Sequence, residues 1–143
     1  MLTLQNYFGR WINHPDATAE RKLNAVKLIA QVNRFVAEAQ QSGIMFHENI
    51  NTESIVSGNE YGGFRPQSCP QGAANSSHKE GAGVDIFDPE NKLDQWIDQF
   101  EDGQRGNSVL EKFGLYREAP ESTLHWCHLT TRAPDSGHRT FLP

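Results

Sequence analysis

The sequence lacks three features that would place it in common functional classes. It contains no basic run and carries a formal net charge of -5, so a general attraction to nucleic acid or to anionic membrane surfaces is not expected. No apolar stretch approaches the roughly 20 residues that span a bilayer, so membrane insertion is not expected either. Residues 1–20 have neither a basic start nor a continuous apolar block. We therefore predict no secretion signal and a cytoplasmic location before any release.

Cysteine is also scarce, with Cys69 and Cys127 as the two copies. One disulfide is possible, but without an export signal free thiols are the simpler expectation. Cys127 is expected in the core and not as a metal ligand. A chain of 143 residues with 36% hydrophobic residues suits one domain over residues 1–143 with one modest core, and we expect a monomer.

The first half of the chain is dominated by a predicted helix at residues 18–42. Thr18 or Asp16 could cap its start, and Gly43 follows its end. A shorter amphipathic segment at residues 4–12 precedes it. The apolar face of the long helix is predicted to carry Leu23, Val26, Ile29 (or Ala30), Val32 and Val36.

The second half mixes short strands with short helices. A long loop rich in Gly, Pro, Ser and Asn separates the two halves, and a loop of this length in a small domain is usually functional or disordered. Together these patterns predict an α+β fold with N-terminal helices packed on a small antiparallel or mixed sheet. The predicted elements are strands at 53–58, 83–87 and 124–131, helices at 91–100 and 108–114, and a turn-rich surface tail at 132–143.

The segment SSHKEGAGVD, residues 76–85, carries the chemistry. It sets His78 and Asp85 seven residues apart, and the segment HWCH supplies two further histidines at 125 and 128. A catalytic zinc takes three ligands of imidazole, carboxylate or thiolate type and leaves one position for water. His78, Asp85 and one histidine of HWCH satisfy that number. Gly81 and Gly83 would let the connecting backbone turn tightly and approach a site closely.

These motifs resemble the zinc D-alanyl-D-alanine peptidases, which share their fold with hedgehog signalling domains. Residues 76–85 are similar to the signature S-x-H-x-x-G-x-A-x-D, the segment WCH is similar to the final Trp-x-His, and GGFRP at 62–66 resembles an SGYR element upstream. The resemblance covers about residues 57–130. It implies that His78, Asp85 and His128 bind Zn²⁺, that Ser76 supports the loop or the substrate, and that Arg65 holds a substrate carboxylate or the developing oxyanion.

The chain departs from the signature at two positions. Gly83 stands where the signature has alanine. His125 stands three residues before the last ligand, where many members carry the acidic general base. Since a neutral imidazole accepts a proton near pH 7, His125 is expected to act as the catalytic base, provided that the strand begins after it or contains a bulge. Glu118 or Glu121 could replace it if the loop folds back. Tyr61 is expected to line the substrate groove.

The expected function is that of a zinc metallopeptidase acting on peptidoglycan stem peptides. Cleavage between terminal D-alanines is the first expectation, and cleavage elsewhere in the stem is the second. The resemblance to small bacteriophage members suggests an endolysin that leaves the host cytoplasm to reach the cell wall, or a virion-associated enzyme. The main alternative is a catalytically inactive zinc-containing binding or virion structural module of the same fold. A third hypothesis is a structural protein without metal.

Overall fold

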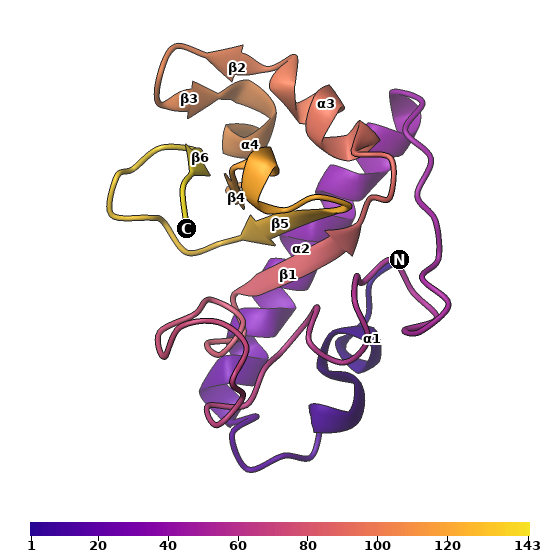
Figure 1. Cartoon of the computed structure of the whole chain (residues 1–143), viewed down its shortest axis with the longest axis vertical. Coiled ribbons are helices and arrows are strands. Elements are labelled where there is room, and N and C mark those ends of the chain that lie inside the picture. Colours follow the sequence, from indigo (N-terminus) through magenta and orange to yellow (C-terminus); the bar gives the residue numbers. More distant parts are fainter.

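The computed structural model describes residues 1–143 and confirms an α+β architecture of helices and a mixed sheet. In chain order the elements are α1 (Leu4–Phe8), η1 (Gly9–Trp11), α2 (Ala19–Gln41), β1 (Gly83–Phe87), α3 (Lys92–Asp98), β2 (Glu101–Asp102), β3 (Gly106–Asn107), α4 (Ser108–Lys112), β4 (Tyr116–Glu118), η2 (Pro120–Ser122), β5 (Trp126–Thr130) and β6 (Thr140–Phe141). Figure 1 shows α2 running behind β1 and β5, with α3 and α4 near its upper end.

Helix α2 begins where the sequence predicts, but it buries a different face. The side chain of Thr18 accepts a hydrogen bond from the Arg21 amide and caps the helix. Leu23 and Val26 were expected in the core, yet they are 70% and 51% exposed. The prediction for these two residues was wrong because the first turns of α2 pack through a small residue and polar contacts. The buried residues are Ala25, Leu28, Ile29, Val32, Phe35, Val36 and Ala39.

Polar contacts of α2 hold the turn before β1, which carries His78. The Asn24 amide donates to the Glu80 carbonyl over 2.9 Å. Gly81 has a φ of +77°, and a Cβ there would lie 2.4 Å from the Arg21 carbonyl oxygen. Only glycine combines that backbone conformation with so close an approach. Gly81 is therefore required at the contact between α2 and the turn before β1. Neither α2 nor any other helix combines the length and hydropathy needed to cross a membrane.

The main sheet has the strand order β1-β5-β4-β6, with antiparallel pairs except for the parallel pair of β4 and β6. Side chains alternate between its two faces. Val84 and Ile86 on β1, with Cys127 and Leu129 on β5, join the core that also contains the buried face of α2. Asp85 lies between Val84 and Ile86, and His128 lies between Cys127 and Leu129. The side chains of Asp85 and His128 therefore point to the other face of the sheet. The alternation thus separates the core from the polar site.

Three local predictions need correction. The strand expected at residues 53–58 is replaced by two isolated bridges: Asn49 pairs with Ser54 within the loop, and Val56 pairs with Ile86 at the outer edge of β1. The tail at 132–143 was expected to form only surface turns, yet Thr140 and Phe141 pair with β4. Strand β4 itself was not predicted. Apart from the bridge of Asn49 with Ser54, these pairings connect segments that are far apart in sequence, so local sequence patterns cannot predict them.

The two cysteines are buried free thiols, as the sequence predicts. Cys127 is fully buried in the core, and burial raises the pKa of its thiol well above the ordinary value. A thiol in that state is neither a nucleophile nor a metal ligand at neutral pH. Cys127 is consequently not a ligand candidate, although it directly precedes His128.

Arg117 forms a buried ion-pair network beneath the sheet. It is 1% exposed, and its guanidinium pairs with Asp94 at 2.9 Å, with Asp98, and with Glu101 at 3.2 Å. Burial raises the pKa of Asp94 to about 6 although Arg117 acts in the opposite direction, and Asp94 Oδ2 has no hydrogen-bond partner. The network joins β4 to α3 and so fixes the strand that carries Glu118.

Replacing Arg117 with Met should destabilise the fold by about 3–5 kcal/mol, because three carboxylates would lose their only shared cation. Urea unfolding followed by circular dichroism measures the change. Lys92→Met removes a cation from an exposed pair with Glu90 and is the matched control, with an expected loss of about 0–1 kcal/mol. Equal losses in the two variants would contradict the structural role assigned to Arg117.

Candidate metal site

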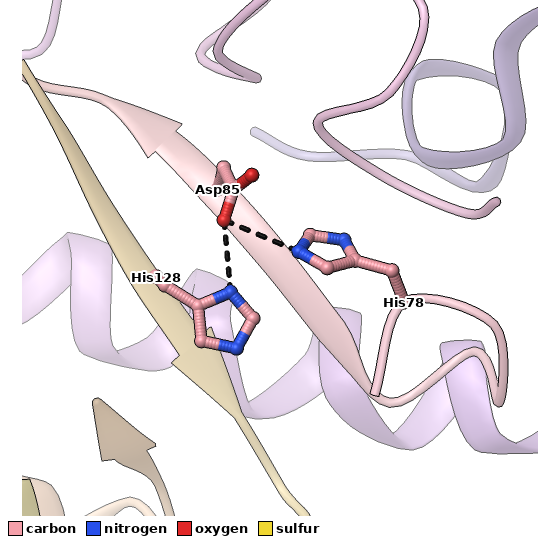
Figure 2. A group of neighbouring side chains, drawn as sticks. All are labelled: His78, Asp85 and His128. Carbon is pink, nitrogen blue, oxygen red and sulfur yellow. Dashed lines mark hydrogen bonds and ion pairs between the residues drawn. The ribbon is translucent and has the colours of Figure 1, made fainter. Parts of the chain in front are cut away.

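Three buried side chains, His78, Asp85 and His128, converge on one point beside strands β1 and β5. Asp85 Oδ1 lies 3.3 Å from His78 Nε2 and 2.8 Å from His128 Nδ1 (Figure 2). The three ligand atoms all lie within 4.8 Å of one another, and the residues are 4%, 8% and 5% exposed. The structure thus brings together the three residues that the sequence predicts as ligands, in a group that could hold a metal ion.

Strand pairing brings Asp85 and His128 together. They are direct register partners on the antiparallel strands β1 and β5. The Asp85 amide donates to the Gly62 carbonyl, and the Asp85 carbonyl accepts from the Ser57 amide, so its backbone bonds point away from β5. Partners in such a non-hydrogen-bonded pair have Cα atoms only about 4.5 Å apart, with their side chains close. His78 reaches the same point from the turn before β1.

The hydrogen bonds behind His78 identify which ring nitrogen can bind a metal. His78 Nδ1 lies 2.8 Å from the Gly63 carbonyl oxygen, which can only accept, so Nδ1 must carry the proton. In the neutral ring Nε2 is then an unprotonated acceptor facing the Asp85 carboxylate. The 3.3 Å contact of Nε2 with Asp85 Oδ1 is therefore favourable only with a second proton on the ring or with a metal ion between the two atoms. The Gly63 carbonyl therefore prepares His78 as a ligand, as backbone carbonyls do at metal sites.

The separations of Asp85 Oδ1 from the two imidazole nitrogens are close to those around a small tetrahedral ion. Ligands at about 2.0–2.1 Å from a tetrahedral centre are about 3.3 Å from one another. The His78–Asp85 separation of 3.3 Å matches this value, and the His128–Asp85 separation of 2.8 Å requires a small outward movement. Burial on its own raises the pKa of the Asp85 carboxyl, but the neighbouring imidazoles of His78 and His128 lower it by more. The carboxylate is thus ionised and available to a cation.

A hydroxyl group and a glycine together hold the second histidine. Ser77 Oγ lies 3.2 Å from His128 Nε2, which leaves Nδ1 of that ring directed at Asp85. A Cβ at Gly83 would lie 2.3 Å from Ser77 Oγ and 3.0 Å from His128 Cε1. The signature has an alanine at the position of Gly83. In this chain the Ser77 hydroxyl occupies the space that an alanine methyl group would need there, which explains the glycine.

Arg65 lies beside the three ligands. Its Nε donates to the Tyr61 carbonyl at 2.6 Å, and Nη2 donates to Asp85 Oδ2 at 3.2 Å. Its Nη1 has no hydrogen-bond partner, and the residue lines a cleft of about 470 Å³ that opens onto the ligands. Gly72 borders this nitrogen, since a Cβ there would lie 3.1 Å from Nη1. A free, positively charged donor is consequently available at the site.

Glu118 faces the same cleft, from strand β4. The register pairs Arg117 with Leu129, so one further step places Glu118 opposite His128, while on its other side Glu118 pairs with Phe141. A row of side chains therefore crosses the sheet from Asp85 through His128 to Glu118. Burial raises the pKa of the Glu118 carboxyl, with smaller effects from the charges of His128, Asp85 and Arg65. The sequence offered Glu118 as one alternative, but finding it required the unpredicted strand β4.

Two residues expected at the site lie elsewhere. His125 is exposed, has a φ of +76° and lies just before β5 begins, with Nδ1 3.0 Å from the Pro89 carbonyl oxygen. It does not line the cleft, so the expectation that it faces the ligands was wrong. The Tyr61 ring stacks on Trp11 at 6.4 Å and is also outside the cleft. Ser76 does line the cleft, and its Oγ accepts from the His78 amide at 3.3 Å.

No family model, curated protein or solved structure matches this chain.

Gly83→Ala should weaken metal binding by about 10- to 100-fold, because the added methyl group displaces the Ser77 hydroxyl that orients His128. Titration of the metal-free protein with Co²⁺, followed by visible absorption, measures the affinity. Ser77→Ala removes the same hydroxyl without adding an atom and should change the affinity in the same direction. Wild-type affinity in both variants would show that Ser77 does not position His128.

Proposed function

We propose that this protein is a zinc-dependent peptidase that hydrolyses peptidoglycan stem peptides. The single observation that carries the proposal is the buried group of His78, Asp85 and His128, with His78 prepared by the Gly63 carbonyl and facing an open cleft. The motif order and the α+β arrangement of helices on a mixed sheet support a fold like that of the D-alanyl-D-alanine peptidases and hedgehog domains.

Zinc is the metal that best suits these ligands. Two imidazole nitrogens and one carboxylate oxygen are typical of catalytic zinc sites, which keep a fourth position for water or substrate. Magnesium and calcium prefer shells made of oxygen atoms alone, and imidazole ligands therefore disfavour them. A zinc ion held by these residues would supply Lewis acidity and a more acidic water for attack on a peptide carbonyl.

The protein residues around the ligands suit the remaining steps of hydrolysis. Glu118, half-buried at the cleft, would take a proton from the attacking water and return it to the leaving amine. The free Nη1 of Arg65 would donate to the oxyanion that develops on the carbonyl, or to a terminal carboxylate of the substrate. Asp85 holds Nη2 of the same guanidinium and so fixes the direction of this donor.

Cleavage between terminal D-alanines is the first candidate reaction, because Arg65 offers a partner for a carboxylate next to the scissile bond. Cleavage elsewhere in the stem is the second. A role as a bacteriophage endolysin or virion-associated enzyme would bring the protein to the cell wall. A zinc-containing module that binds wall peptides without cleaving them is the alternative, and the absence of an acidic residue three positions before His128 favours it.

Zinc-loaded protein should cleave pentapeptide or cross-linked muropeptides, and a chelator should abolish the cleavage. Mass spectrometry of the products identifies the cleaved bond. Loss of one alanine indicates a carboxypeptidase, and any other fragment indicates cleavage elsewhere in the stem peptide. Intact muropeptides in the presence of bound zinc would instead support the binding module.

Glu118→Gln should lower kcat by about 10²- to 10⁴-fold while zinc content stays at one ion per chain, because the amide cannot accept the proton. His125→Gln is the matched control and should retain turnover, since His125 lies outside the cleft. Steady-state kinetics together with metal analysis of both variants separates the two residues. Loss of turnover in His125→Gln alone would return the role of base to His125.

A further inference from the structure

Strand β5 directs a row of side chains along the cleft. Trp126, His128 and Thr130 alternate on one face of the strand, and all three line the cleft. The Thr131 amide donates to the Ala82 carbonyl at 3.0 Å, so the pairing with the chain before β1 continues past the end of β5. Arg132 therefore follows on the same face and also lines the cleft. The row runs from an aromatic ring, past the metal ligand, to a guanidinium.

Arg132 is the one charged side chain of the cleft that lies away from the metal ligands. The other charged side chains of its lining, Arg65, Asp85 and Glu118, surround or adjoin the ligand group. At the opposite end of the row, beyond Trp126, the lining consists of the uncharged Ser122 and Thr123. The cleft is consequently asymmetric, with a single cation at one end.

The guanidinium of Arg132 is held in place but keeps free donors. Its Nη1 donates to the Asn75 carbonyl and pairs with Glu80 Oε2 at 2.9 Å. Its Nε and Nη2 have no partner, and the side chain is 41% exposed. An ion pair as exposed as that with Glu80 contributes little free energy, so it offers weak competition to a ligand. Planar free N–H groups of this kind suit a carboxylate better than any neutral group.

We infer that Arg132 forms a second subsite, which binds a carboxylate of the peptide substrate away from the cleaved bond. Arg132 follows His128 by four positions, so their Cα atoms are at most about 14 Å apart. An extended peptide covers that distance with about four residues. The preferred substrates are therefore acidic peptides with a free carboxyl group within about four residues of the cleaved bond. This inference rests on the proposed peptidase function.

The test compares two stem peptides that differ in one group, an internal free carboxyl in the first and its amide in the second. Wild-type protein should show a kcat/KM about 10- to 100-fold higher for the carboxyl peptide, with the difference mainly in KM. Arg132→Gln should bring this ratio close to one while zinc content stays unchanged. Arg132→Lys, which keeps the charge without the planar fork, should give an intermediate ratio.

Arg105→Gln is the matched control, because Arg105 is exposed, lies outside the cleft and carries the same charge. It should keep the wild-type ratio. A wild-type ratio near one, or a ratio that survives in Arg132→Gln, would overturn the subsite while leaving the peptidase intact.

Calorimetric titration of zinc-loaded protein with the same two peptides separates failure of the subsite from failure of the proposed function. No cleavage of either peptide, but tighter binding of the carboxyl peptide that Arg132→Gln abolishes, would support the subsite and overturn the peptidase. Absence of both cleavage and binding would overturn both proposals.

Discussion

The rest of the site depends on one interaction, the placement of the ionised Asp85 carboxylate between two imidazoles inside the sheet. A buried carboxylate is costly unless positive charge or hydrogen-bond donors surround it. Asp85 has the two rings on one oxygen and Arg65 on the other. The Gly63 carbonyl accepts the Nδ1 proton of His78, so His78 can interact with Asp85 only through Nε2. That contact is favourable with a second proton on the ring or with a metal ion between Nε2 and Oδ1.

The scaffold around this group explains several features of the sequence together. The alternation of β1 and β5 places Val84, Ile86, Cys127 and Leu129 in the core and the ligands on the opposite face. Two glycines of the motif have separate purposes: Gly81 admits the backbone of α2, and Gly83 admits the Ser77 hydroxyl. Residues 76–85 thus contain two candidate ligands, His78 and Asp85, and the glycines that allow the close contacts around them.

Residue types and spacing predict His78, Asp85 and one histidine of HWCH as candidate ligands, and the resemblance to the zinc peptidases selects His128. The α+β class and the bounds of α2 also follow from local patterns, whereas β5 begins at Trp126, two residues later than the strand predicted at 124–131. The buried face of α2 does not follow from local patterns, since Leu23 and Val26 satisfy the apolar period yet find no partner. Glu118 could not be assigned because its position depends on β4, whose pairing with β5 and β6 joins distant segments. His125 was misassigned because its spacing from His128 does not reveal the positive φ of His125 just before β5. With that turn, His125 lies outside the cleft.

The proposed function requires His78, Asp85 and His128 to bind one zinc ion. The most direct measurement is X-ray absorption spectroscopy on protein stripped of metal and reloaded with one equivalent of Zn²⁺. We expect stoichiometric uptake and a first shell of nitrogen and oxygen atoms at about 2.0–2.2 Å, with the scattering pattern of two imidazoles. Failure to retain one equivalent, or a sulfur ligand at about 2.3 Å, would contradict it.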